Sequence, residues 1–129
     1  MKKEIKSQNA PAAIGPYSQA IQAEGKTIYI SGQLPVNPKT GEFSGDTITS
    51  QTLQSLNNIK AILEEAGADM NNIVKTTVLL KDIKYFTHMN EVYQEFFNPP
   101  YPARAAYQIG ALPKDALVEI EAVAVIPEK

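Results

Sequence analysis

Two stretches of the chain place apolar residues at the three-and-four spacing that predicts an amphipathic helix. The first stretch starts near Thr49 and precedes Gly67, a residue type that commonly follows a helix C-terminus. Its apolar positions are Leu53, Leu56, Ile59, Leu63 and Ala66. The second stretch ends at Asn98-Pro99-Pro100, because proline cannot continue the backbone hydrogen-bond ladder. Its apolar positions are Tyr85, Met89, Val92, Tyr93 and Phe96.

Shorter runs rich in β-branched residues predict strands around these helices. Gln19 to Ala23 and Thr27 to Ser31 flank Glu24-Gly25-Lys26, which predicts an early hairpin with a glycine in its turn. The remaining predicted strands are Ile73 to Leu80, Ala103 to Gly110 and Leu117 to Ile126, the last two joined by residues 111–116. The order is strands, helix, strand, helix and two strands, which predicts an α+β fold with two helices on a sheet.

The last predicted strand carries information about assembly, because alternate residues point to opposite faces. One face is apolar throughout and consists of Val118, Ile120, Ala122 and Ala124. The other begins with Glu119 and Glu121 but continues with Val123 and Val125. Two helices cover only one side of a sheet, so we expect another copy of the chain to cover these valines.

Length and composition narrow the class of protein. A chain of 129 residues suits one domain, residues 1–129, with a core of its own. The absence of cysteine excludes disulfides, thiol catalysis and thiolate-bound metals. The single histidine, His88, lacks companions for a transition-metal site, so we expect no metal and assign it no role.

Charge and hydropathy further restrict the expected partners. The formal net charge is -2, the pI is near 5.4, and the lysines are dispersed, so nucleic acid is not an expected partner. The chain has neither a secretory signal nor an apolar run of about 18 residues, so we expect no membrane partner and a cytoplasmic location.

Arg104 is the only arginine, against eleven lysines, and its near neighbours in Pro102-Ala103-Arg104-Ala105-Ala106 are uncharged. A guanidinium in such surroundings needs an anionic partner, and its rigid fork of donors fits a carboxylate. The partner is either a small organic acid or one of the protein's fourteen acidic side chains. These two alternatives remain open at this point.

A proton-transfer partner follows if the last two strands pair as an antiparallel hairpin. That pairing would place Glu119 opposite Gln108, on the same face as Arg104 and about 13 Å along the strand from it. A small acid would fit between the two side chains, with its carboxylate on Arg104 and its reacting carbon or a water near Glu119. Glu121 is the alternative base.

Several motifs resemble, in order, those of the RidA family of enamine/imine deaminases, and the resemblance covers essentially the whole chain. The C-terminal signature comprises Pro102-Ala103-Arg104-Ala105-Ala106-Tyr107, Ala111-Leu112-Pro113-Lys114 and Val118-Glu119-Ile120-Glu121-Ala122. Earlier motifs are the residues 9–19, Ser31-Gly32-Gln33-Leu34-Pro35-Val36-Asn37-Pro38, Val74-Lys75-Thr76-Thr77-Val78 and Met89-Asn90-Glu91-Val92-Tyr93.

This resemblance implies a fold and a chemistry. The fold would be the chorismate mutase-like α+β sandwich, a mixed sheet of about six strands with two helices on one face, assembled as a homotrimer with clefts between subunits. The activity would be 2-iminobutanoate/2-iminopropanoate deamination. The protein would hydrolyse reactive products of pyridoxal-phosphate dehydratases to 2-oxo acids and ammonia, which is a detoxification. No cofactor would be required.

The same resemblance assigns roles to particular residues. Arg104 would bind the carboxylate of a 2-imino or 2-oxo acid, and Glu119 would hold and activate water. The remaining substrate-binding positions are Tyr17, Ser31, Gly32, Asn90 and Ala106. Many relatives carry a cysteine at the position of Ala106. One alternative is a regulatory protein that binds a small carboxylate in the same cleft without catalysis. A second alternative is a ribonuclease, which the acidic pI disfavours.

Overall fold

The computed structural model of the protein describes residues 2–128. Among these residues are six strands, two α-helices and three single turns of 3-10 helix. The strands are β1 (Lys2–Ile5), β2 (Ala20–Ala23), β3 (Lys26–Gln33), β4 (Ile73–Leu80), β5 (Ala103–Gln108) and β6 (Val118–Ile126). The helices are α1 (Ile48–Glu65) and α2 (Phe86–Gln94), and the 3-10 turns are Met70–Asn72, Ile83–Tyr85 and Pro113–Asp115.

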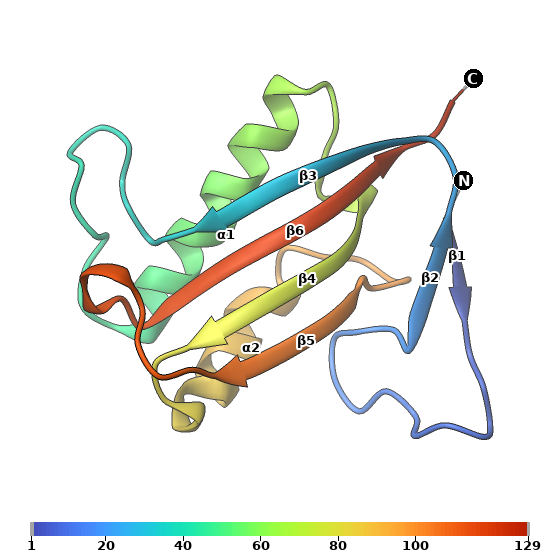
Figure 1. Ribbon diagram of the computed structural model, residues 1–129, viewed down its shortest axis with the longest axis horizontal. Coiled ribbons are helices and arrows are strands. Elements are labelled where there is room, and N and C mark those ends of the chain that lie inside the picture. Colours follow the sequence, from blue (N-terminus) through green and yellow to red (C-terminus); the bar gives the residue numbers. More distant parts are fainter. Residues whose placement is uncertain (1, 129) are drawn as a thin grey trace.

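The strands form two sheets, and both helices pack on the same face of the larger one (Figure 1). The larger sheet has the order β3-β6-β4-β5, in which β5 runs parallel to β4 and the other neighbours are antiparallel. The strands β1 and β2 form a separate antiparallel pair. The predicted α+β class, with two helices on one face of a mixed sheet, is confirmed, but the six strands divide into sheets of four and two rather than forming one sheet.

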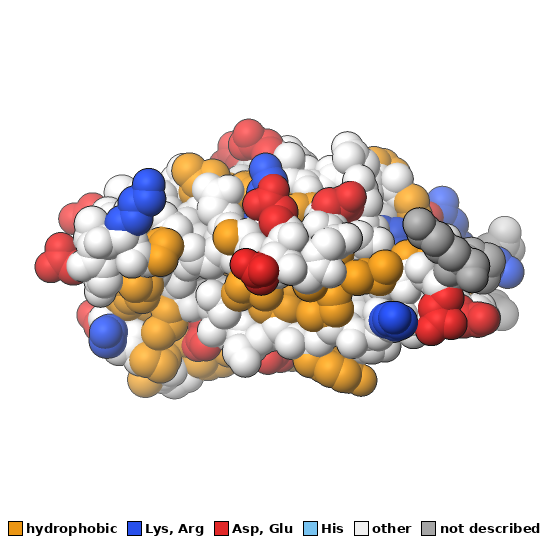
Figure 2. Space-filling model, turned by 90° about the horizontal axis from the view of Figure 1, so that it is seen from above, with side chains coloured by type: hydrophobic (Ala, Val, Ile, Leu, Met, Phe, Trp, Pro, Cys, Tyr) orange, Lys and Arg blue, Asp and Glu red, His pale blue; other side chains and the backbone are white. Residues whose placement is uncertain are grey.

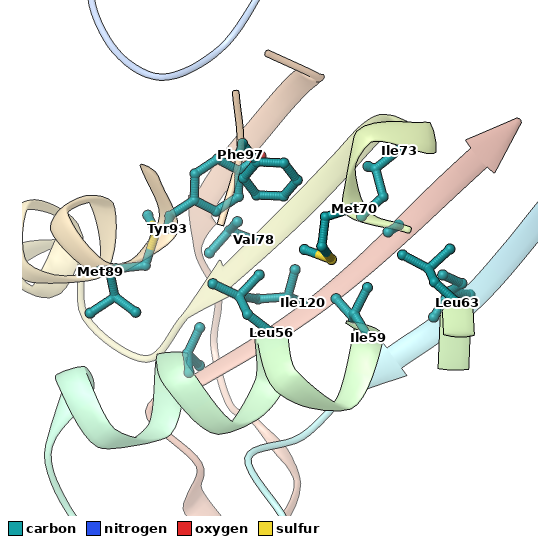
Figure 3. Packing of buried hydrophobic residues seen from close by; sticks show 14 of the residues in the cluster. Leu56, Ile59, Leu63, Met70, Ile73, Val78, Met89, Tyr93, Phe97 and Ile120 are labelled. Atoms are coloured by element: carbon teal, nitrogen blue, oxygen red, sulfur yellow. The ribbon is translucent and has the colours of Figure 1, made fainter. Parts of the chain in front are cut away.

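The core lies between the helices and the larger sheet. On α1, Leu56, Ile59 and Leu63 have no exposed surface, and Figure 3 shows all three on the side of the helix that faces the sheet. Thr47 caps this helix by accepting a hydrogen bond from the Ser50 backbone N–H, and Gly67 follows its last turn as predicted. Leu53 is an exception, because 45% of its surface is exposed and it contributes little to the stripe. Truncating Leu56 to alanine would cost about 2–5 kcal/mol of stability.

The predicted hairpin between β2 and β3 is wrong, although both strands exist. β2 pairs with β1, whereas β3 pairs with β6. Gly25, with a φ of 146°, forms a corner between them that passes close to the end of β6. A Cβ atom at Gly25 would lie 2.8 Å from the Ile126 carbonyl carbon, so the glycine is needed for this close approach.

The predicted hairpin between the last two strands is also wrong. β4 lies between them, parallel to β5 and antiparallel to β6. β5 can lie parallel to β4 because the α2 segment carries the chain back across the sheet before β5 begins. As a result, β5 and β6 are next-nearest neighbours, and the predicted register between them does not exist.

The face of the larger sheet opposite the helices carries exposed apolar side chains. Tyr29 on β3 is 81% exposed and Tyr107 on β5 is 55% exposed, while Val123 lies beside Tyr29 in the register. Figure 2 looks onto the β3 edge of the sheet rather than onto this face, and there a band of hydrophobic side chains crosses the middle of the molecule between charged groups. In the described part of the chain, this face therefore leaves large apolar side chains exposed.

Candidate active site

Arg104 lies on the edge strand β5, with its side chain on the helix side of the sheet. The β4–β5 register pairs it with Thr76, whose buried side chain also faces the helices. Its Nη1 donates a hydrogen bond to Oδ1 of Asn90 on α2 at 2.5 Å. Three aromatic rings surround the guanidinium: its Cζ lies 4.7 Å from the ring centroid of Tyr93, 5.4 Å from that of Phe86 and 5.6 Å from that of Tyr17.

The charge of Arg104 has no carboxylate partner within residues 2–128. The ion pairs found there join Lys81 to Asp115 and Lys84 to Asp82. Burial lowers the pKa of the guanidinium, an effect that the neighbouring Tyr93 and Tyr17 oppose. Of the two partners considered from sequence, the structural ion pair is therefore absent from the described chain, and a half-buried cation remains open to an external anion.

Arg104, Asn90 and Tyr17 define what we call the arginine half-site. Tyr17 reaches it because the next residue, Ser18, forms a bridge with Ala103 at the start of β5. The Ser18 backbone N–H donates to the Pro102 carbonyl at 3.0 Å, and its hydroxyl donates to the Tyr101 carbonyl. Segments far apart in the sequence thus meet at one end of β5.

Ala106 occupies a neighbouring position. It lies two residues beyond Arg104 on β5, shares its face of the sheet, and packs against the core beside Val78. The structure therefore places it on the same side as the arginine half-site.

Glu119, Gly32 and Ser31 lie together at a second place, which we call the glutamate half-site. In β3, Ile30 pairs with Ala122 and Gln33 pairs with Ile120, so one extra residue forms a β-bulge at positions 31–32. The bulge brings the Gly32 backbone against the Glu119 side chain, where a Cβ atom would lie 2.9 Å from Cδ of Glu119 and closer still to Oε2. Glycine is required because any side chain would displace the carboxylate.

The two half-sites face opposite sides of the sheet. Arg104 pairs with Thr76 of β4, whereas Glu119 pairs with Leu79, three residues further along the same strand. Because side chains alternate along a strand, an odd separation places them on opposite faces. The prediction that Arg104 and Glu119 point the same way is therefore wrong, since it depended on the hairpin that β4 interrupts. Within one copy of the chain, no small acid can contact both.

Two hollows flank the arginine half-site, and a third lies elsewhere on the surface of the single chain. One of about 820 Å³ is lined by Tyr17, by other residues of the N-terminal segment and by residues 99–101. A smaller one, of about 180 Å³, is lined by Phe86, Asn90 and their neighbours on α2. A third, of about 310 Å³, lies on the open sheet face beside Glu121 and Tyr29.

Two residues around Arg104 were not identified from the sequence as parts of a site. Phe86 was not named, and Tyr93 was assigned only to the core stripe of the second helix. With Asn90, they form the series i, i+4 and i+7 on α2, which places all three on one helix face. The helical spacing of these residues is the sequence signal that could have identified Phe86 and Tyr93 as neighbours of the single arginine.

The described residues show no group of three or more histidine, aspartate or glutamate side chains arranged to hold a metal ion. His88 is exposed on α2. None of the helices in residues 2–128 is long and apolar enough to cross a lipid bilayer.

Fold and site together define an α+β domain that presents an unpaired arginine on one face and a glutamate on the other. Residues 7–126 match the family described as endoribonuclease L-PSP. The chain is 55% identical to a RutC family protein of Pyrococcus horikoshii, covering 96% of this chain and 98% of the relative. It is 50% identical to the 2-iminobutanoate/2-iminopropanoate deaminase of Mus musculus, covering 97% and 92%.

A solved structure has a similar sequence and the same fold. The crystal structure of E. coli TdcF with bound serine superposes with a TM-score of 0.75 at 44% identity, covering 97% of this chain and 99% of that one. The chain belongs to the endoribonuclease L-PSP family, which is the RidA family that its motifs resemble.

Proposed function

We propose that this protein is a 2-iminobutanoate/2-iminopropanoate deaminase, which hydrolyses reactive imines to 2-oxo acids and ammonia. The observation that carries the proposal is the half-buried guanidinium of Arg104, which has no carboxylate partner in the described chain and so suits a substrate carboxylate. The name of the Mus musculus relative, at 50% identity, supports the same reaction.

Hydrolysis of the imine requires one water molecule and returns one ammonia. Arg104 holds the substrate carboxylate and so fixes the neighbouring C=N carbon near Glu119. Glu119 accepts a proton from water while the water oxygen bonds to that carbon, and the imine nitrogen takes up a proton. The resulting carbinolamine then breaks its C–N bond while Glu119 transfers the hydroxyl proton to the departing nitrogen, and the 2-oxo acid and ammonia are released.

The opposite orientation of the two half-sites leads us to propose that the cleft forms between copies of the chain. The arginine half-site of one protomer would face the glutamate half-site of the next, and a closed ring of three would contain three equivalent clefts. The exposed apolar face, with Tyr29 and Val123, supports such an assembly because it needs cover. The homotrimer is thus part of the proposal.

Subunit mixing tests function and cleft together. The variants Arg104→Ala and Glu119→Ala should each lose accelerated ammonia release from the intermediate of a threonine dehydratase. Co-expressed in equal amounts, they assort at random, and about a quarter of the clefts receive Arg104 from one subunit and Glu119 from another. We expect about a quarter of wild-type activity to return.

The outcomes of this experiment separate the parts of the proposal. Full activity in both single variants would overturn the deaminase assignment. Inactive single variants without recovery on mixing would overturn the shared cleft. A wild-type protein that binds 2-oxobutanoate but does not speed imine hydrolysis would favour the regulatory carboxylate-binding alternative.

A further inference from the structure

We propose that Phe86 and Tyr93 are positioning residues which, with Tyr17, hold the Arg104 guanidinium by its faces and leave its N–H donors for the anion. This inference rests on the proposed function, because it explains how the carboxylate-binding group is prepared. Neither Phe86 nor Tyr93 needs to touch the substrate, since both act through Arg104. We call the three rings the aromatic cradle.

The cradle holds the cation without using its hydrogen-bond donors. The centroid distances of 4.7, 5.4 and 5.6 Å lie within the range in which a guanidinium is attracted to an aromatic face. Arginine has five N–H donors, all in the plane of the group, and among the described residues Asn90 is the acceptor found for them. A carboxylate in place of these rings would have occupied donors and neutralised the charge.

Contacts with Thr76 and Phe97 fix the position of the Tyr93 ring. Its hydroxyl lies 2.7 Å from Oγ1 of Thr76 in a fully buried pair, and Thr76 is the residue that β4 places beside Arg104. Its ring also packs on Phe97, with centroids 4.6 Å apart, and Figure 3 shows the two rings together above β4. One residue of β4 therefore sets the place of both the arginine and the ring on which it lies.

Neutral surroundings among the described residues leave the charge of the guanidinium without a counter-ion. Burial raises the pKa of Tyr93 to about 12, so this phenol stays uncharged at neutral pH. Burial also removes water from Arg104. A partly dehydrated cation among neutral rings attracts a carboxylate more strongly than the same cation in water. The cradle accordingly prepares Arg104 for the substrate before the substrate arrives.

The uniqueness of Arg104 permits a direct test. As the chain has one arginine, nitrogen-15 NMR of the protein shows one arginine Nε–Hε resonance. Ring currents should displace this resonance from its position in free arginine. We expect it to move toward the free value in Phe86→Leu and Tyr93→Leu. It should move much less in Tyr93→Phe, which loses the hydrogen bond to Thr76 but keeps the ring and its packing on Phe97.

Binding of pyruvate, measured by titration of the same resonance, supplies the functional readout. Phe86→Leu and Tyr93→Leu should each weaken pyruvate binding about tenfold, whereas Tyr93→Phe should remain within about twofold of wild type. Tyr85→Leu is the matched control, because its ring lies next to Phe86 in sequence and contacts Lys84 rather than Arg104. It should change neither the resonance nor the affinity.

The results decide the proposal independently of catalysis. The cradle is overturned if Phe86→Leu, whose half-buried site tolerates truncation, leaves both the Arg104 resonance and pyruvate affinity unchanged. An equal loss in Tyr85→Leu would also overturn it, because that loss would be a general structural effect. Cradle-dependent pyruvate binding in a protein without imine turnover would support the cradle and reject the deaminase assignment.

Discussion

Replacing Gly32 with alanine tests whether the position of the Glu119 carboxylate matters for the proposed reaction. The added methyl carbon would lie 2.9 Å from Cδ of Glu119 and 3.2 Å from its Cγ. Non-bonded carbon atoms prefer separations of about 3.5–4.0 Å, so the carboxylate must move by about 0.6–1 Å. A shift of about 1 Å in a catalytic group lowers turnover by about a hundredfold, so we expect kcat to fall by about 30-fold to 100-fold.

The same substitution should leave the fold intact. The crowded atoms belong to the end of a flexible side chain rather than to the backbone, so Glu119 can rotate away. Exchanging glycine for alanine also restricts the unfolded chain, which offsets part of any strain, and the free energy of unfolding should change by less than about 1 kcal/mol. The expected signature is therefore a loss of kcat without a loss of stability.

Gly110→Ala provides the matched control, because a Cβ atom there meets nothing within 4 Å. The assay is ammonia or 2-oxobutanoate release in a coupled reaction with threonine dehydratase, together with urea unfolding of each variant. Wild-type turnover in Gly32→Ala would refute the reasoning that the bulge positions Glu119. A comparable loss in Gly110→Ala would show that the assay responds to glycine replacement in general.

Three further predictions use other parts of the molecule. Arg104→Lys should lower kcat/KM at least about a hundredfold despite keeping the charge, because a lysine lacks the planar fork, and steady-state kinetics with Arg104→Ala for comparison would detect any rescue. The free energy of unfolding should fall by about 2–3 kcal/mol as pH rises from 10 to 12, because the pKa of Tyr93 is about 12 in the fold and about 10 when unfolded; this stabilisation is complete below pH 10. Tyr93→Phe should flatten that part of the urea-unfolding profile, and an unchanged slope would contradict the assignment to Tyr93. Val123→Asp should yield a monomer in sedimentation and reduce turnover, whereas Leu53→Asp on the helical side should not, and a wild-type sedimentation coefficient for Val123→Asp would count against the proposed interface.

The sequence predicts the helices and strands of this fold better than it predicts which strands pair. Helix α1 follows from the spacing of Leu56, Ile59 and Leu63, because burial of a helix face leaves a periodic trace. Strand pairing leaves no such trace when the true neighbour is distant in sequence. β3 pairs with β6 rather than with the adjacent β2, a choice made by the packing of the whole sheet.

The candidate site shows the same division. Motifs single out Arg104, Asn90 and Tyr17, and the structure brings these three together. The relation between Arg104 and Glu119 could not be predicted, because inserting β4 between their strands changes the register by an odd number of residues. A shift of one residue reverses the face of every side chain, so the assumed hairpin placed Glu119 on the wrong face of the sheet.

The position of β6 in the larger sheet affects how the protein must be made. This strand comes last in the sequence, yet it lies between β3 and β4 and bonds to both. A nascent chain that has emerged only as far as α2 holds two strands of the larger sheet, β3 and β4, without the strand that lies between them, so the apolar stripes of its helices have no complete sheet to pack on. We therefore expect the domain to fold only after residues up to Ile126 have left the ribosome, so translation products that stop before β6 should be degraded rather than accumulate as partial subunits.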